Sequence, residues 1–230
     1  MRFLHPPVWN MHIGLIPAAG MARRLKIDTP KELIIARGKP VIDYGIEHLI
    51  AAKVDKIVIV IRHGKEAIRT YIEKTYPHLP TQFVYQTGLV GNLINAIYAS
   101  YEAIQGHIVY FCMADVMMLP NPFLTTRTGE LTVLCQEVVG AAWRHLGVVD
   151  VANGRIVDKP SRFYGRICWG ALIWQPSFTE KIMKATDFTA VMNSADWNYI
   201  VNIDEFVDIG IDKTLILPLS AKESHYAYIG

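Results

Sequence analysis

The chain has 230 residues and a net charge of +2 at pH 7, with 51% hydrophobic and 19% charged residues. This length suits one large domain or two small ones, and the composition is that of an ordinary globular protein. The basic residues are scattered, which excludes a nucleic-acid-binding arm, and no apolar stretch approaches the roughly 20 residues of a membrane span. Three widely spaced cysteines (Cys112, Cys135 and Cys168) form no C-x-x-C pair, which is typical of buried, reduced thiols in a cytoplasmic protein.

Strand and helix patterns alternate in the first half of the chain. Apolar runs predict buried strands at 12–17, 56–61, 81–85 and 107–113. Helical spacing of apolar residues predicts helices over 40–53, 64–76 and 91–104. This rhythm predicts an α/β fold with a mostly parallel, doubly wound sheet. Ligands of such sheets bind beyond the carboxyl ends of the strands, where we expect Ala18–Gly20 and Asp115 to face one crevice.

The second half of the chain has a different pattern. It predicts strands at 131–135, 147–151, 155–157, 167–174 and 205–208, with one helix over 176–184. No linker, repeat or low-complexity segment separates the two halves. We therefore expect one compact domain, with a smaller mixed-strand subregion that closes one side of the crevice.

The turn after the first strand is the strongest chemical signal. Ala18-Ala19-Gly20 would let backbone N–H groups approach a polyphosphate, and Arg24 and Lys31 would add positive charge. This is neither a Walker A loop nor a G-x-G-x-x-G motif. An ordinary strand-to-helix turn with surface basic residues is the alternative.

The stretch "LIPAAGMARRLKIDTPKEL" resembles the signature of the nucleotidyltransferase superfamily, which includes the sugar-phosphate nucleotidylyltransferases (NDP-sugar pyrophosphorylases) and their cytidylyltransferase relatives. The matching positions are Ala18, Ala19, Gly20, Arg24, Leu25, Pro30 and Lys31. Ala22 replaces the usual second glycine and Arg23 replaces a common Ser or Thr. The resemblance implies a GT-A/Rossmann-like nucleotidyltransferase fold. From the residue pattern we expect a short extension over 1–11, with one arginine and two prolines, and one domain over 12–230.

Later segments resemble the family in the same order. The resemblance of "YQTGLVGNLINAI" places Gln86 and Gly91 at the nucleobase, and that of "FCMADVMML" makes Asp115 a magnesium ligand. "FVDIGIDKTL" would supply the second magnesium ligand, Asp208, with Ile211 where Thr is usual.

Two segments are similar to the part of the family that meets the acceptor. "GRIVDKPS" resembles an E-K-P segment, with Asp158 in place of Glu and Lys159 kept. "RICWGALIW" resembles the strand whose glycine faces the sugar, here Gly170. The resemblance thus divides the domain into a nucleotide-binding half, 12–118, and an acceptor-binding half, 119–230.

The resemblance implies a Mg²⁺-dependent enzyme that joins a nucleoside triphosphate to a sugar 1-phosphate, releasing pyrophosphate. Arg24 would hold the pyrophosphate and Lys31 would neutralise the α-phosphate. The implied partners are the triphosphate and a phosphorylated small molecule, with no nucleic acid and no membrane; a homo-oligomer stays open.

Alternatives stay open at this stage. The acceptor could be phosphocholine, an inositol phosphate or methylerythritol phosphate, and a catalytically silent binding protein is a third reading. Single residues also have plain structural readings: Asp115 as a cap, Asp208 in a turn, Lys159 in solvent, Gln86 at a helix start and Gly170 at a bulge. Neither the base nor the acceptor follows from the sequence.

Overall fold

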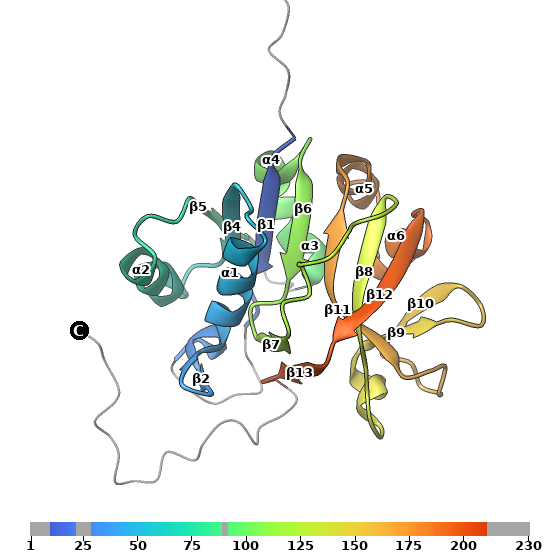
Figure 1. Ribbon diagram of the computed structural model, residues 1–230. Coiled ribbons are helices and arrows are strands. Elements are labelled where there is room, and N and C mark those ends of the chain that lie inside the picture. The colour runs from blue at the N-terminus through green and yellow to red at the C-terminus, as the bar shows by residue number, and fades with distance from the viewer. Residues whose placement is uncertain (1–9, 22–28, 89–91, 211–230) are drawn as a thin grey trace, which may run out of the picture.

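The computed structural model of the protein describes residues 10–21, 29–88 and 92–210. A nine-stranded mixed sheet runs through this part, with helices on both faces (Figure 1). Its strand order is β10-β9-β11-β6-β1-β4-β5, and β8 also pairs with β11 and carries β12. The predicted mostly parallel, doubly wound α/β architecture is confirmed, with the parallel strands concentrated in the first half.

Parallel pairing joins the strands of the first half. These strands are β1 (His12–Pro17), β4 (Lys56–Ile61), β5 (Thr81–Tyr85) and β6 (Ile108–Cys112). Their carboxyl ends lie at one edge of the sheet, as the βαβ pattern requires. The strand β1 lies between β4 and β6, so the turn that follows it starts at the centre of this edge.

In the second half, β8 (Leu131–Glu137) and β9 (Gly147–Asp150) pair antiparallel with β11 (Ile167–Trp174), and β10 (Arg155–Asp158) pairs antiparallel with β9. The strand β12 (Trp197–Ile203) pairs parallel with β8. Beyond the last residue of β6, β11 pairs with β9 instead, through Cys168 and Val148. The β9–β10 hairpin therefore continues the sheet past the end of β6.

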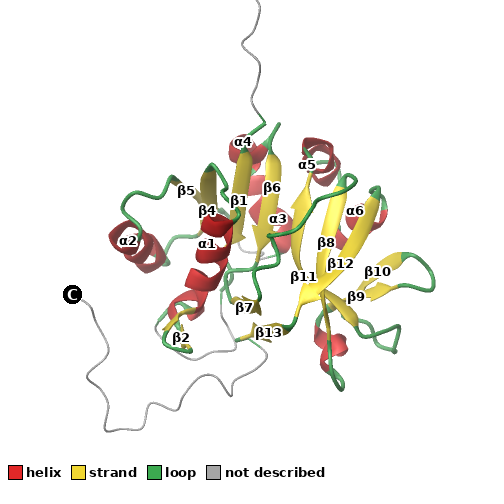
Figure 2. Cartoon of the chain, in the orientation of Figure 1, coloured by secondary structure: helices red, strands yellow, loops and turns green. Residues whose placement is uncertain are grey.

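Two apolar cores lie on the two faces of the sheet. One packs under α1 (Val41–Ala51) and α2 (Glu66–Thr75). The other packs under α3 (Leu93–Ala99), α4 (Tyr101–Ile104), α5 (Pro176–Ile182) and α6 (Phe188–Asn193). Figure 2 shows α1 crossing the face opposite α3. Side chains of β4 alternate between the two cores, because successive strand residues point to opposite faces.

Two small sheets lie outside the main one. A two-stranded sheet joins β7 (Val116–Leu119) to β13 (Glu205–Asp208), and a hairpin joins β2 (Ile35–Ala36) to β3 (Lys39–Pro40). The Arg37 guanidinium, at the tip of this hairpin, donates to the Glu205 carboxylate of β13. The hairpin and the end of the described chain are thus tied together.

The structure corrects one predicted element and adds others. The helix predicted over 91–104 begins at Leu93, because Asn92 caps it by accepting from the Asn95 amide at 3.0 Å. It also breaks at Ser100, whose hydroxyl donates to the Ile97 carbonyl at 2.8 Å and competes with the helix backbone. The strands β7 and β12 and helix α6 were not predicted. No helix within the described ranges is long and apolar enough to cross a membrane.

Candidate active site

The turn after β1 is buried and fixed to β4. The Ala18 amide donates to the Val60 carbonyl at 2.7 Å, which continues the pairing of β1 with β4 by one residue. Ala18 and Ala19 are buried. A Cβ on Gly20 would lie 3.8 Å from Lys31 Nζ. The turn and the Pro30-Lys31 segment, separated along the chain, therefore meet.

Lys31 forms an ion pair with Asp115. Lys31 begins the short 3₁₀ helix η1 (Lys31–Leu33), and Asp115 lies between β6 and β7. The two side chains are 19% and 9% exposed. The lysine predicted to neutralise phosphate charge and the predicted first metal ligand thus share one site.

The pairing of β7 with β13 brings Asp208 to the same place. Asp208 lies opposite Val116, and the Ile209 amide donates to the Asp115 carbonyl at 3.2 Å. A Cβ on Gly210 would lie 3.0 Å from Asp208 Oδ1 and 4.0 Å from Asp115 Oδ2. The two carboxylates, 93 positions apart in the sequence (208 − 115), therefore converge on one point.

The charge balance of the site keeps Lys31 protonated. Burial alone would lower the pKa of Lys31. The negative charge and hydrogen bond of Asp115, with smaller contributions from Glu32 and Asp208, outweigh burial and raise that pKa above its usual value. Lys31 is therefore a permanent cation at neutral pH, beside two acidic side chains.

The donor set fits a magnesium ion. Mg²⁺ prefers oxygen ligands and is usually held by one or two carboxylates, with water and substrate phosphates completing its octahedron. Asp115 and Asp208 supply two such carboxylates, and Asp115 already faces a cation in the Lys31 ammonium. Among the described residues no group of three or more acidic, His or Cys side chains is placed to hold a metal ion. A metal here would therefore depend on substrate phosphates for further ligands.

Sequence reasoning missed three charged residues behind the turn. Lys65 Nζ donates to the Ala18 carbonyl at 2.9 Å and to Glu32 Oε1 at 2.7 Å. Arg62 Nε donates to the Ala19 carbonyl at 2.5 Å. All three look like ordinary surface charges in the sequence; the neighbouring Pro-Lys motif was the one signal near Glu32.

Other predicted residues of the nucleotide half are placed less fully. Gln86 follows β5 and is buried, and its backbone amide donates to the Ile61 carbonyl at 2.8 Å. Arg24, with Ala22 and Arg23, lies outside the described residues, as do Gly91 and Ile211. Gln86 lies at the carboxyl edge with the turn, and its contact with a base stays a prediction.

Two of the predicted acceptor residues lie at the exposed end of β10. Asp158 is the last residue of β10 and Lys159 follows it; they are 49% and 67% exposed, with Lys159 Nζ 3.8 Å from Asp158 Oδ2. Lys159 has a φ of +41°, in the left-handed region, and its amide donates to the Leu146 carbonyl at 3.0 Å.

Gly170 lies at an irregularity of β11. The register between β11 and β8 shifts between Trp169 and Ala171. A Cβ on Gly170 would lie 2.9 Å from Ile203 Cδ1 and 3.0 Å from Phe206 Cε2. The glycine leaves room for these apolar side chains, so its predicted contact with a sugar stays a prediction.

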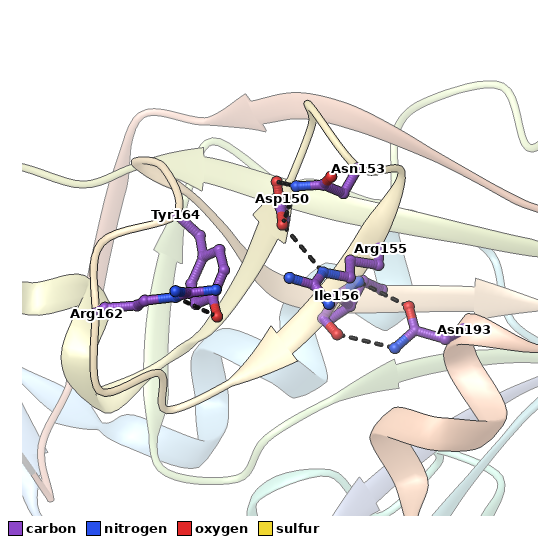
Figure 3. A network of polar contacts seen from close by, with 7 residues as sticks. All are labelled: Asp150, Asn153, Arg155, Ile156, Arg162, Tyr164 and Asn193. Atoms are coloured by element: carbon purple, nitrogen blue, oxygen red, sulfur yellow. Dashed lines mark hydrogen bonds and ion pairs between the residues drawn. The ribbon is translucent and has the colours of Figure 1, made fainter.

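A polar network fixes the β9–β10 hairpin (Figure 3). The buried Asp150 carboxylate accepts from Asn153 Nδ2 at 2.9 Å and from Arg155 Nε at 3.0 Å. The Asn193 side chain bonds both the amide and the carbonyl of Ile156, at 2.7 and 2.8 Å, which fastens β10 to α6. These groups hold the loop that carries Asp158 and Lys159.

The comparisons with known proteins decide the family. The profile of the MobA-like NTP transferase domain matches residues 14–160. The chain belongs to the MobA-like NTP transferase family. The matched part includes Ala18–Gly20, Lys31, Asp115 and Lys159, and it crosses the boundary at 118 between the two predicted halves. The resemblance to nucleotidyltransferases is therefore confirmed.

Curated relatives of this MobA-like chain act on different acceptors. It is 34% identical over 112 residues to the 2-aminoethylphosphonate cytidylyltransferase of Lancefieldella rimae, covering 46% of this chain and 43% of that protein. It is 37% identical over 56 residues to the 2-C-methyl-D-erythritol 4-phosphate cytidylyltransferase of Vibrio parahaemolyticus, covering 24% of each. The bifunctional protein GlmU of Thermus thermophilus is 26% identical over 136 residues, covering 59% and 26%. The chain thus spans less than half the length of these relatives.

Solved structures agree on the fold. A Bacillus anthracis protein assigned provisionally as a glucose-1-phosphate thymidylyltransferase superposes with a TM-score of 0.79 at 15% identity, covering 89% of this chain and 92% of that one. A UDP-glucose pyrophosphorylase from Acinetobacter baumannii superposes with a TM-score of 0.72 at 16% identity, covering 90% and 91%. At these identities the likeness shows a shared nucleotidyltransferase fold.

Proposed function

We propose that this MobA-like NTP transferase moves a nucleotidyl group from a nucleoside triphosphate to a phosphorylated small molecule. The acceptor that we favour is a sugar 1-phosphate, and the products are then an NDP-sugar and pyrophosphate. One observation carries the proposal. The turn after β1, Lys31, Asp115 and Asp208 meet at the carboxyl edge of the parallel strands, although they come from four separate segments.

The reaction needs positioning and charge stabilisation more than covalent chemistry. An acceptor phosphate oxygen attacks the α-phosphorus in line; a new P–O bond forms while the bond from the α-phosphorus to the α–β bridging oxygen breaks, and pyrophosphate leaves with the bridging oxygen. The turn amides orient the triphosphate, and Lys31 neutralises the charge that builds on the α-phosphate. Asp115 and Asp208 would hold Mg²⁺, which supplies further positive charge to the phosphates.

The remaining predicted residues complete the proposal. Arg24, outside the described residues, holds the pyrophosphate, and Gln86 and Gly91 contact the base. Asp158, Lys159 and Gly170 bind the acceptor. We propose that residues 1–11 are an extension, that 12–118 form a nucleotide-binding half and that 119–230 form an acceptor-binding half. We also propose that the protein is cytoplasmic.

A second candidate is a cytidylyltransferase with a non-sugar acceptor. Two relatives with higher identity than the GlmU of Thermus thermophilus are named as cytidylyltransferases, one for 2-aminoethylphosphonate and one for 2-C-methyl-D-erythritol 4-phosphate. Their acceptors share a phosphate or phosphonate group with sugar 1-phosphates, so the same nucleotide half would serve. Asp158 and Lys159, the residues proposed to bind the acceptor, are exposed in the structure, and we propose the same role for them with either acceptor class.

Pyrophosphate release tests both candidates. The purified protein, with Mg²⁺ and each of five nucleoside triphosphates, is offered sugar 1-phosphates, 2-aminoethylphosphonate, methylerythritol phosphate, phosphocholine and inositol phosphate. Release with one pair supports the transferase and names its substrates. Release with CTP and a non-sugar acceptor alone selects the second candidate. Nucleotide binding without release across the panel rejects both in favour of a silent binding protein.

A further inference from the structure

Two consecutive carbonyl groups of the turn are held from behind by cations. Ala18 O accepts from Lys65 Nζ at 2.9 Å, and Ala19 O accepts from Arg62 Nε at 2.5 Å. Both cations belong to the loop between β4 and α2, and neither lies in the signature that identified the site. Side chains therefore fix the backbone of the turn, in addition to the hydrogen bond from the Ala18 amide to β4.

Fixing these carbonyls also fixes the amides that follow them. In a planar trans peptide the C=O and the next N–H point in opposite directions. With Ala18 O and Ala19 O turned towards Lys65 and Arg62, the amides of Ala19 and Gly20 point away from those cations. A row of amides with one direction is the kind of donor set that binds phosphate oxygens.

Lys65 also reaches the segment that carries Lys31. Its ammonium donates to Glu32 Oε1 at 2.7 Å, and Glu32 is the neighbour of Lys31 in the helix η1. The side chains of Lys65 and Glu32 are 9% and 1% exposed. One buried ammonium thus bridges the two segments that bring the turn amides and Lys31 together.

Burying the Lys65–Glu32 ion pair contributes little to the stability of the fold. Burial lowers the pKa of Lys65 and raises that of Glu32, and the ion pair compensates only partly in each case. Apolar residues of similar volume often serve stability as well as a buried ion pair does. The hydrogen bond to Ala18 O is what an apolar pair would not supply.

We propose that Lys65, held by Glu32, is a positioning residue for nucleotidyl transfer: it sets the direction of the turn amides and the place of Lys31. The inference rests on the proposed function. It adds a role for a residue that contacts no phosphate itself and that acts through the Ala18 carbonyl and Glu32.

Four variants separate positioning from plain structural support. Lys65→Met removes the bridge but leaves Glu32 buried without its partner. The double variant Lys65→Met/Glu32→Gln also removes that charge, so its melting temperature should recover. Glu32→Gln alone is the third. Lys181→Met is the matched control, because Lys181 pairs with the mostly buried Glu130 on the far side of the domain.

The measured quantities are melting temperature, nucleotide dissociation constant by calorimetry, and steady-state kcat and KM. We expect Lys65→Met to lower kcat/KM for the triphosphate at least tenfold, with KM for the acceptor unchanged. The double variant should regain stability and keep this defect, since it still lacks the bond to Ala18 O. Lys181→Met should keep wild-type kinetics.

Two results overturn the inference. The first is a Lys65→Met protein whose kcat and KM equal those of the Lys181→Met control. The second is a double variant, Lys65→Met/Glu32→Gln, that regains both the melting temperature and the kinetics of the wild-type protein. A wild-type protein that binds a triphosphate without turnover rejects the proposed function alone, and the dissociation constants of the variants then decide on positioning. A wild-type protein that binds no triphosphate rejects both.

Discussion

Charged side chains are held differently in two regions of the molecule. The first is the region around the turn after β1, and the second is the β9–β10 hairpin. In the first region Lys65 and Glu32 are buried and Lys31 and Asp115 are mostly buried, each in an ion pair. In the second, Asp158 and Lys159 are about half and two-thirds exposed. The first region is thus organised before a ligand binds. In the hairpin the buried Asp150 is paired with Arg155, whereas Asp158 and Lys159 at its end stay exposed to a ligand. On the proposed function, one nucleotide half can serve different acceptors, as the names of the relatives suggest.

The largest expected effect comes from the organised region. Asp115→Asn removes one proposed magnesium ligand and the counter-ion of Lys31. Loss of one such charged group at a reacting phosphate lowers turnover by about 10²–10³-fold. Pyrophosphate release measures this, with circular dichroism to confirm the fold.

Glu130→Gln is the control for this change, because Glu130 is a mostly buried carboxylate that pairs with Lys181 away from the site. It should retain wild-type turnover. An Asp115→Asn protein with more than half of the wild-type rate would contradict the assignment of Asp115.

Gly147→Ala should damage the second region without reaching the first. A Cβ on Gly147 would lie 1.9 Å from Trp169 Nε1, so the indole ring must move. Overpacking of this kind lowers the free energy of unfolding by about 1–3 kcal/mol. Urea denaturation measures the loss, and triphosphate affinity should stay at its wild-type value. A Gly147→Ala protein that binds the triphosphate more weakly but keeps wild-type stability would contradict the prediction that the two regions are independent.

Lys159→Met should change acceptor binding without changing stability. Lys159 is 67% exposed, and loss of such a side chain alters the free energy of unfolding by less than about 0.5 kcal/mol. We expect KM for the acceptor to rise about tenfold, roughly 1.4 kcal/mol, with KM for the triphosphate unchanged. Lys53→Met is a matched control, since Lys53 is an exposed lysine with a φ of +56°. Equal KM values in both variants would remove Lys159 from the acceptor site.

The last prediction concerns the pH dependence of stability and rests on two buried thiols. Burial raises the pKa of Cys112, at the end of β6, and of Cys168, in β11, to about 12. In the unfolded chain these thiols ionise near pH 8.5, so the folded state binds more protons above that pH. Stability should therefore be full below about pH 8.5 and fall by about 1 kcal/mol per thiol between pH 9 and 10.

Urea denaturation at pH 8, 9 and 10 measures this fall. Cys168→Ala should show a shallower pH dependence than the wild-type protein, whatever its stability at pH 8. An identical dependence would mean that Cys168 is accessible to solvent in the folded protein.

Sequence patterns predicted the central strands well. The bounds predicted for β1, β4, β5, β11 and β13 are those of the structure, because buried strands are continuous apolar runs between polar turns. The pattern failed for β12, whose alternation is interrupted by Asn198 and Asn202. The side chain of Asn202 donates to the Pro122 carbonyl at 2.8 Å, a distant partner that no local pattern indicates.

The same limit applies to the candidate site. Residues of the signature, such as Lys31 and Asp115, could be named from the order of motifs, and the structure brings them together. Lys65, Arg62 and Glu32 could not, because a charged residue after a strand looks the same whether it lies in solvent or under a turn. Only tertiary contacts distinguish them: Lys65 and Arg62 donate to the Ala18 and Ala19 carbonyls, and Glu32 accepts from Lys65.

A crystal structure of the protein with Mg²⁺ and a non-hydrolysable nucleoside triphosphate would test the central claim most directly. The account predicts phosphate oxygens on the amides of Ala19 and Gly20, Lys31 beside the α-phosphate, and the metal bound by Asp115 and Asp208. A triphosphate bound elsewhere, or a metal that contacts neither aspartate, would contradict it.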